Sequence, residues 1–115
     1  MSGSDFDVIR GLTTATVRRQ EMLSNNLANI ETKNYVRQDI DFGSVLNGLA
    51  NESGFSGDTS TSVISRSTYR DYSNPVTLES ELSKLYENHL RYILLTRQIG
   101  HNFEHMKKAL EVRGQ

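Results

Sequence analysis

One spacing in the sequence constrains the fold more than any other feature. Near the C-terminus, mostly apolar residues recur every four and then every three positions, in an unbroken stripe from Leu78 to Leu110. This heptad pattern is typical of a long helix that packs lengthwise against another helix. Its polar members, His89 and Thr96, either set the register of that packing or lie at its edge. The stripe consists of Leu78, Leu82, Leu85, His89, Tyr92, Thr96, Ile99, Phe103, Met106 and Leu110.

Capping signals place the start of this helix. Pro75 disfavours helical backbone at the residue before it, and Thr77 is a suitable N-cap. Glu79 and Glu81 fall in the first turn, where negative charge complements the helix dipole. Together these signals predict a helix over residues 78–112.

The N-terminal segment carries a second stripe with the same kind of spacing. Its apolar residues, from Val8 to Ile30, recur at intervals of three and four positions and predict a helix over residues 5–30. Thr13 and Gln20 interrupt this stripe, so it is less continuous than the C-terminal one. The strongly apolar residues are therefore concentrated in the two ends of the chain.

The segment between the predicted helices, residues 31–75, has a different composition. Asn34 stands in a predicted turn, because asparagine tolerates left-handed backbone better than most other non-glycine residues. The sequence of residues 42–50 is compatible with a helical turn, and that of residues 62–65 with a strand. From about residue 47 onward, glycine and small polar residues dominate. They predict a flexible loop with little core of its own, following an extended arm.

These elements predict a single all-α domain over residues 1–115. We expect two long terminal helices that form an antiparallel coiled-coil hairpin, with a loop-rich middle that has room for a short β element. The expected units are residues 5–30, 31–75 and 76–113. Because only 36% of the residues are hydrophobic, the core that one chain can bury should be modest.

Composition and charge argue against several classes of partner. The net charge of −1 gives no positive field that would recruit nucleic acid or anionic lipid. The absence of cysteine excludes disulfides and cysteine metal sites. No apolar run approaches the roughly 18–20 residues of a membrane span. The N-terminus lacks the basic and apolar regions of a cleaved signal peptide.

One motif suggests metal chemistry. His101, Glu104 and His105 match the H-x-x-E-H pattern of inverted zinc proteases, and two histidines four positions apart share one face of a helix. A metal-dependent hydrolase also needs a third ligand and a substrate cleft. Phe103 and Met106, on the apolar stripe, favour packing of that helix face instead. We therefore interpret the motif as structural and expect no bound metal.

Other polar groups are too sparse to form a catalytic or binding site. Asp39 and Asp41 share one face of an extended segment, but nothing in the sequence buries them, so we interpret them as a solvated face. Arg18 and Arg19 are too few for a nucleic-acid patch. The sequence contains no phosphate-binding glycine loop and no nucleophile elbow. It predicts no catalytic residue and no cofactor.

Two stretches resemble a known family. Residues 24–35 read S-N-N-L-A-N-I-E-T-K-N-Y, which resembles the N-terminal signature of bacterial flagellar rod, hook and axial proteins. Residues 76–92 read V-T-L-E-S-E-L-S-K-L-Y-E-N-H-L-R-Y and are similar to proximal-rod members of that family. The chain departs from the family pattern where Lys33 and Asn34 replace Pro-Gly, and where Thr77 replaces aspartate.

The resemblance implies a structural, non-enzymatic subunit of the flagellar basal-body rod. Its implied partners are copies of itself, other rod proteins, and MS-ring adaptor and export-gate proteins at the rod base. It also implies export by the flagellar type III apparatus without a cleaved signal peptide, and a rod that spans the periplasm, transmits torque and contains the export channel. Another rod protein of the family and a non-flagellar helical-hairpin adaptor remain alternatives.

The resemblance, together with the two stripes, implies an assembly interface on the terminal helices. We expect the C-terminal stripe to face Leu12, Leu23, Leu27 and Ile30 of the first helix within the chain, while neighbouring subunits complete the core. The expected interface residues are Leu12, Leu23, Asn25, Asn26, Leu27, Asn29, Ile30, Tyr35, Leu78, Leu82, Leu85, Tyr92, Ile99, Phe103, Met106 and Leu110.

Overall fold

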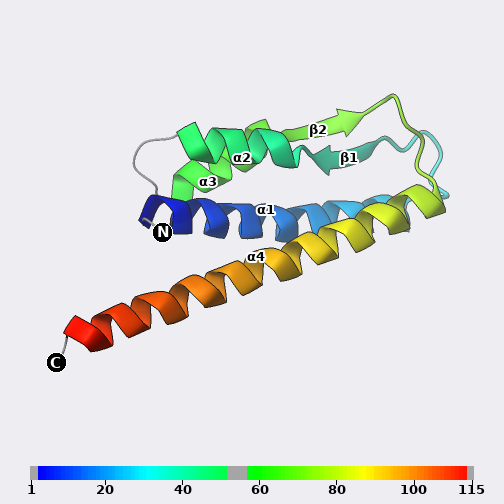
Figure 1. Ribbon diagram of the computed structural model, residues 1–115. Coiled ribbons are helices and arrows are strands. Elements are labelled where there is room, and N and C mark those ends of the chain that lie inside the picture. Colours follow the sequence, from blue (N-terminus) through cyan, green and yellow to red (C-terminus); the bar gives the residue numbers. More distant parts are fainter. Residues whose placement is uncertain (1–2, 52–56, 114–115) are drawn as a thin grey trace.

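Two long antiparallel helices dominate the molecule. The computed structural model describes residues 3–51 and 57–113. Helix α1 (Gly3–Ala28) and helix α4 (Leu78–Arg113) pack lengthwise against each other, and the remaining elements cover the far side of α1 (Figure 1). The molecule is elongated, at 65 × 26 × 17 Å. The predicted fold class is confirmed: a mainly helical chain with long terminal helices and a small sheet between them.

Local signals in the sequence place the ends of these helices. The Thr77 hydroxyl accepts a hydrogen bond from the Ser80 N–H at 3.2 Å, so the predicted N-cap of α4 is confirmed. Helix α1 ends at Ala28, two residues before the predicted position, and a turn follows. In that turn Asn34 has φ 63°, the left-handed conformation that its side chain tolerates.

The middle of the chain is more ordered than its composition predicts. It forms strand β1 (Arg37–Ile40), helix α2 (Phe42–Asn51), helix α3 (Gly57–Arg66) and strand β2 (Thr68–Asp71). The two strands pair antiparallel, with Arg37 opposite Asp71 and Ile40 opposite Thr68. Within the described residues, the flexible-loop prediction is therefore wrong, while residues 52–56 of that loop lie outside the description. The predicted helical turn is α2, and residues 62–65 are helical rather than extended.

The middle segment also supplies most of the core. Leu12 and Ala15 of α1 pack against buried residues of the later elements, which are Ile40, Val45, Leu49, Val63 and Ile64. Close approach makes this packing possible, since a Cβ added at Gly48 would lie 2.7 Å from a Val63 methyl carbon. The small polar residues that suggested a loop form the outer faces of two short amphipathic helices.

Candidate assembly interface

In its first half, helix α4 meets α1 and β1 through polar side chains. Glu81 and Asn88, seven positions apart on one face, are 0% and 1% exposed. Leu78 and Leu82, from the predicted stripe, are about half exposed, at 49% and 48%. The expectation that this part of the stripe forms the intrachain seam is therefore wrong. The helix is rotated so that hydrogen-bonding groups face α1 and β1, where they find partners, and the leucines face outward.

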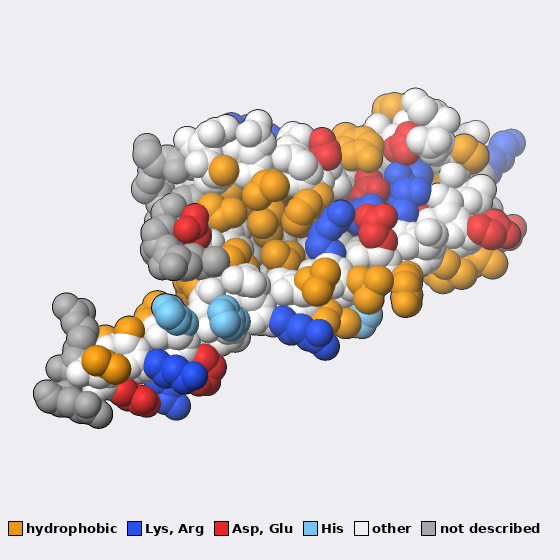
Figure 2. All heavy atoms as spheres, viewed as in Figure 1, with side chains coloured by type: hydrophobic (Ala, Val, Ile, Leu, Met, Phe, Trp, Pro, Cys, Tyr) orange, Lys and Arg blue, Asp and Glu red, His pale blue; other side chains and the backbone are white. Residues whose placement is uncertain are grey.

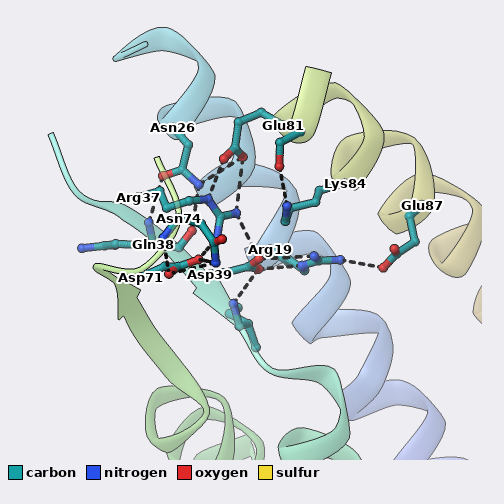
Figure 3. A network of polar contacts seen from close by, with 12 residues as sticks. Arg19, Asn26, Arg37, Gln38, Asp39, Asp71, Asn74, Glu81, Lys84 and Glu87 are labelled. Atoms are coloured by element: carbon teal, nitrogen blue, oxygen red, sulfur yellow. Dashed lines mark hydrogen bonds and ion pairs between the residues drawn. The ribbon is translucent and has the colours of Figure 1, made fainter. Parts of the chain in front are cut away.

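The centre of the polar contact is Arg37 on β1 (Figure 3). Its Nε donates to Glu81 Oε1 at 2.6 Å, its Nη2 to Asp39 Oδ2 at 3.1 Å and its Nη1 to Asp71 Oδ2 at 3.1 Å. Arg37 and Asp39 are neighbours on one face of β1, because side chains two apart on a strand point the same way. One guanidinium thus joins β1, β2 and α4.

Arg19 on α1 extends the network. Its Nε donates to Asp39 Oδ1 at 2.6 Å and its Nη2 to Asp39 Oδ2 at 3.3 Å, a bidentate pair. Its Nη1 reaches Glu87 of α4 at 3.4 Å (Figure 3). Charges therefore alternate without a break from Glu87 through Arg19, Asp39 and Arg37 to Glu81. The interpretation of Asp39 as solvated is wrong: its carboxylate is buried between two arginines.

The network favours the charged forms of Asp39 and Arg37. Burial alone would raise the pKa of Asp39, but the hydrogen bonds and positive charge of Arg19, together with Arg37, keep that pKa below its ordinary value. Burial alone would lower the pKa of Arg37, but its bonds to Glu81 and Asp39 raise that pKa above the ordinary value. Removing one member would leave an opposite charge buried without compensation.

The asparagine motif after α1 also acts within the chain. Asn26 Nδ2 donates to the Gln38 carbonyl at 2.8 Å, and Asn26 Oδ1 accepts from the Gln38 N–H at 3.0 Å and from the Tyr35 hydroxyl at 3.1 Å. The side-chain amide therefore pairs with β1 as a neighbouring strand would. Asn26 is fully buried within the chain and offers no surface of its own.

The other motif residues shape the turn from α1 into β1. Asn29 Nδ2 donates to the Asn25 carbonyl at 2.8 Å, near the end of α1 where helical carbonyls lack partners. Asn29 Oδ1 accepts from the Thr32 hydroxyl at 3.0 Å. With the left-handed Asn34, these bonds reverse the chain in a few residues. Asn34, which stands where the family pattern has glycine, thus has left-handed backbone.

The outward face of α4 is apolar over much of its length. Figure 2 shows hydrophobic side chains along the edge of α4 that faces away from the small sheet. The large exposed residues on this helix are Leu78, Leu82, Tyr86, Leu90, Tyr92, Leu94, Phe103, Met106, Leu110 and Val112. An exposed apolar face of this extent on a slender molecule is typical of an interaction surface. Elsewhere on α4, the Arg91 guanidinium carbon lies 4.0 Å from the centre of the Phe42 ring, a cation–π contact with the first residue of α2.

The expected interface residues fall into three groups. Leu12 and Leu23, like Asn26, are buried in the chain's own packing and offer no surface. The exposed members are Asn25, Leu78, Leu82, Tyr92, Phe103, Met106 and Leu110. The partly buried members are Leu27, Asn29, Ile30, Tyr35, Leu85 and Ile99.

The ion-pair network was not predicted from the sequence. Its only sequence signal is the alternation of Arg37 and Asp39 on a predicted extended segment, which puts opposite charges on one face. Their partners Arg19 and Glu81 lie 20 and 44 positions from the residues that they bind.

The structure gives no support to the metal motif. His101, Glu104 and His105 are all exposed on the last turns of α4. Among residues 3–51 and 57–113, no group of three or more His, Cys, Asp or Glu side chains is placed to hold a metal ion. None of the helices in the described ranges combines the length and hydrophobicity that a membrane crossing requires.

Comparisons with known proteins agree with the sequence resemblance. The model of the family described as flagella basal body rod protein matches residues 11–35. The flagellar basal body rod protein FlgB of Bacillus subtilis (strain 168) is 25% identical over 122 residues, an alignment that covers 95% of this chain and 94% of that protein. Together they support a flagellar basal-body rod protein of the FlgB kind. The resemblance seen in the sequence is thus confirmed.

The segment that matches the rod family coincides with the intrachain contacts described above. Residues 11–35 run from the buried face of α1 through the turn, and they include Arg19, Asn26 and Asn34. The rod-protein signature therefore coincides, in this chain, with the groups that hold β1 against the two long helices.

Proposed function

We propose that this chain is a structural subunit of the flagellar proximal rod and that it polymerises through its terminal helices. One observation carries the proposal: α4 buries polar groups against its own chain and leaves most of its large apolar side chains exposed. Burial of apolar surface is the main favourable term in protein association, so these side chains gain most from a neighbouring subunit. The match to FlgB along 95% of the chain favours this rod position over another rod protein such as FlgC.

The proposed surface consists mainly of the exposed members of the expected set. Leu78 and Leu82 lie near the start of α4, and Phe103, Met106 and Leu110 lie near its end. Leu27, near the end of α1, and Ile30, in the turn after it, are partly buried and would contribute their exposed parts. The buried residues Leu12, Leu23 and Asn26 support the interface from inside the subunit.

In this role the chain would contact copies of itself, other rod proteins, and adaptor and export-gate proteins at the rod base. It would reach the periplasm through the flagellar type III apparatus, without a cleaved signal peptide. The stacked helices would transmit torque and surround the export channel. The role is mechanical and uses no cofactor, no metal and no catalytic residue.

A single apolar-to-acidic change tests the proposal. Phe103→Asp places a charge on the exposed face of α4. Because Phe103 is largely exposed in the isolated chain, the unfolding midpoint should change no more than for an ordinary surface substitution. In a bacterium whose own copy is deleted, this variant should be exported but should form no rods and give no motility. The matched control is Tyr72→Asp, at another exposed aromatic residue away from α4. Motile cells with intact rods that contain the Phe103→Asp protein would refute the proposal.

A further inference from the structure

A groove between the two long helices carries an unused hydrogen-bond acceptor. The groove has a volume of about 290 Å³ and is lined by Thr16, Val17, Gln20 and Glu21 of α1 and by Asn88, His89 and Tyr92 of α4. Val17 and Tyr92 give it an apolar wall that is open to solvent, since their exposed fractions are 44% and 38%. Glu21 lies on the exposed side of α1 and gives the groove a carboxylate.

Only the nitrogen of the Asn88 side-chain amide has hydrogen-bond partners in the described part of its own chain. Its Nδ2 donates to the Thr16 carbonyl at 2.8 Å and to Gln20 Oε1 at 3.3 Å. Its Oδ1 is buried and has no hydrogen-bond donor among the described residues. Burying an acceptor without a donor is costly, and buried polar atoms in folded proteins usually have a hydrogen-bond partner. Asn88 is one of the residues that line the groove, so a molecule bound there would lie beside this acceptor.

The last turns of α4 extend beyond the start of α1, so α1 does not cover them. The Thr16–Asn88 bond sets the antiparallel register: thirteen residues before Thr16 is Gly3, the first residue of α1, and thirteen residues after Asn88 is His101. Residues 101–113, which we call the α4 overhang, therefore project past the start of α1 (Figure 1).

The side chains of the overhang complement those that line the groove. Phe103, Met106 and Leu110 lie on one face at intervals of three and four positions, and all are more than half exposed. Lys107 lies on the same face, one turn from both Phe103 and Leu110. Its ammonium group carries three N–H donors and a positive charge. An apolar stripe with one cation matches an apolar groove that has one carboxylate and one free acceptor.

We propose that the α4 overhang of one copy docks in the α1–α4 groove of a second copy. Phe103 and Met106 would cover Val17 and Tyr92, and Lys107 would pair with Glu21 and donate to Asn88 Oδ1. The contact joins two different surfaces of identical chains, so it is heterologous and repeats into an open filament rather than a closed dimer. This inference rests on the proposed rod function and adds the segment and the groove through which copies meet.

The absence of cysteine allows a clean crosslinking test. Copies that carry Val17→Cys and copies that carry Phe103→Cys each have one thiol, so any product of a short bismaleimide between them is intermolecular. In concentrated mixtures and in isolated rods, this pair should crosslink well above the control pair Val17→Cys with Tyr72→Cys. Equal yields for the two pairs would overturn the docking.

A charge exchange tests the polar part of the contact. Adding Lys107→Glu to the Phe103→Cys copy should lower the crosslink yield roughly twofold to fivefold, as expected for an exposed ion pair. Adding Glu21→Lys to the Val17→Cys copy should then restore the yield. Neither residue takes part in an ion pair within the described part of the chain, so a purely structural role predicts no such rescue. A crosslink yield that is the same with and without the two substitutions would refute the pairing.

The docking and the rod function can fail separately. If deletion of the gene abolishes rods but the cysteine pair does not crosslink in complemented rods, the docking is wrong and the rod function stands. If the deletion leaves rods and motility intact, the rod function itself is wrong, and the docking loses the function on which it rests.

Discussion

The α2–α3 region and the α4 overhang use apolar residues in opposite ways. Leu49, in a segment whose composition resembles a loop, is 0% exposed, whereas Leu110, in the most regular apolar stripe of the chain, is 59% exposed. The difference shows that periodicity reveals which face of a helix requires a partner and gives no information on where that partner is. For α2 and α3 the partner is α1, whereas the large apolar side chains of the overhang stay exposed in the described chain.

Removing the centre of the ion-pair network should have the largest effect on the compact region. Arg37→Met leaves the Glu81 carboxylate buried with no arginine partner and leaves Asp39 with Arg19 alone, so we expect a loss of roughly 3–5 kcal/mol in the free energy of unfolding. Urea denaturation followed by circular dichroism measures it. Arg70→Met, at an exposed arginine on the neighbouring strand, is the control and should change stability by less than about 0.5 kcal/mol. Similar losses for the two variants would contradict the role of the network.

The same substitution in the two regions tests the comparison directly. Leu49→Ala removes a buried side chain from the core and should cost about 2–5 kcal/mol. Leu110→Ala removes one that contacts solvent in the isolated chain and should cost no more than about 0.5 kcal/mol. Both values come from denaturation of the purified chain at low concentration. A large loss for Leu110→Ala would show that the overhang already has a partner within the chain.

Glycine-to-alanine changes should have opposite signs in the two regions. At Gly48 the new Cβ meets a Val63 methyl carbon at 2.7 Å, and the resulting overpacking should cost about 1–3 kcal/mol. At Gly100, just before the overhang, nothing lies within 4 Å, so the gain in helix propensity should stabilise by about 0.5–1 kcal/mol. Thermal melts of the pair measure both effects. Stabilisation by Gly48→Ala would mean that α2 and α3 are less closely packed than described.

Acid should weaken the compact region before it affects the overhang. Because folding keeps the pKa of Asp39 below its unfolded value of about 3.9, the network stabilises the fold above that pH. The pKa of Asp71 is lowered in the same direction, first by its hydrogen bonds from Asn74 and then by Arg37. The contribution is lost as the pH falls below about 4 and through the lower folded pKa.

Unfolding free energies measured between pH 3 and pH 7 test this expectation. Asp39→Asn should flatten the acid limb of the curve, because the variant has no carboxylate to protonate at that position. An unchanged acid limb in the variant would show that other carboxylates cause the loss.

Signals that act over a few residues could be predicted from the sequence. The Thr77 cap, the left-handed Asn34 and the two long helices each depend on residues within one or two turns, and the structure confirms them. Helix α3 was missed because its serines and threonines resemble those of a loop until Val63 and Ile64 find the core. The network was missed because its partners are far apart along the chain.

The sequence by itself determined that two long helices with apolar faces form the ends of this chain, since capping and periodicity are local properties. It also carried the rod-family signature. Only the tertiary structure decided which face of α4 meets α1. That choice depends on whether Glu81 and Asn88 find buried partners on α1 and β1, and hydrogen bonds between distant residues leave no periodic trace. Because Glu81 and the Asn88 amide nitrogen bind partners inside the chain, many of the leucines and aromatic residues of α4 stay exposed.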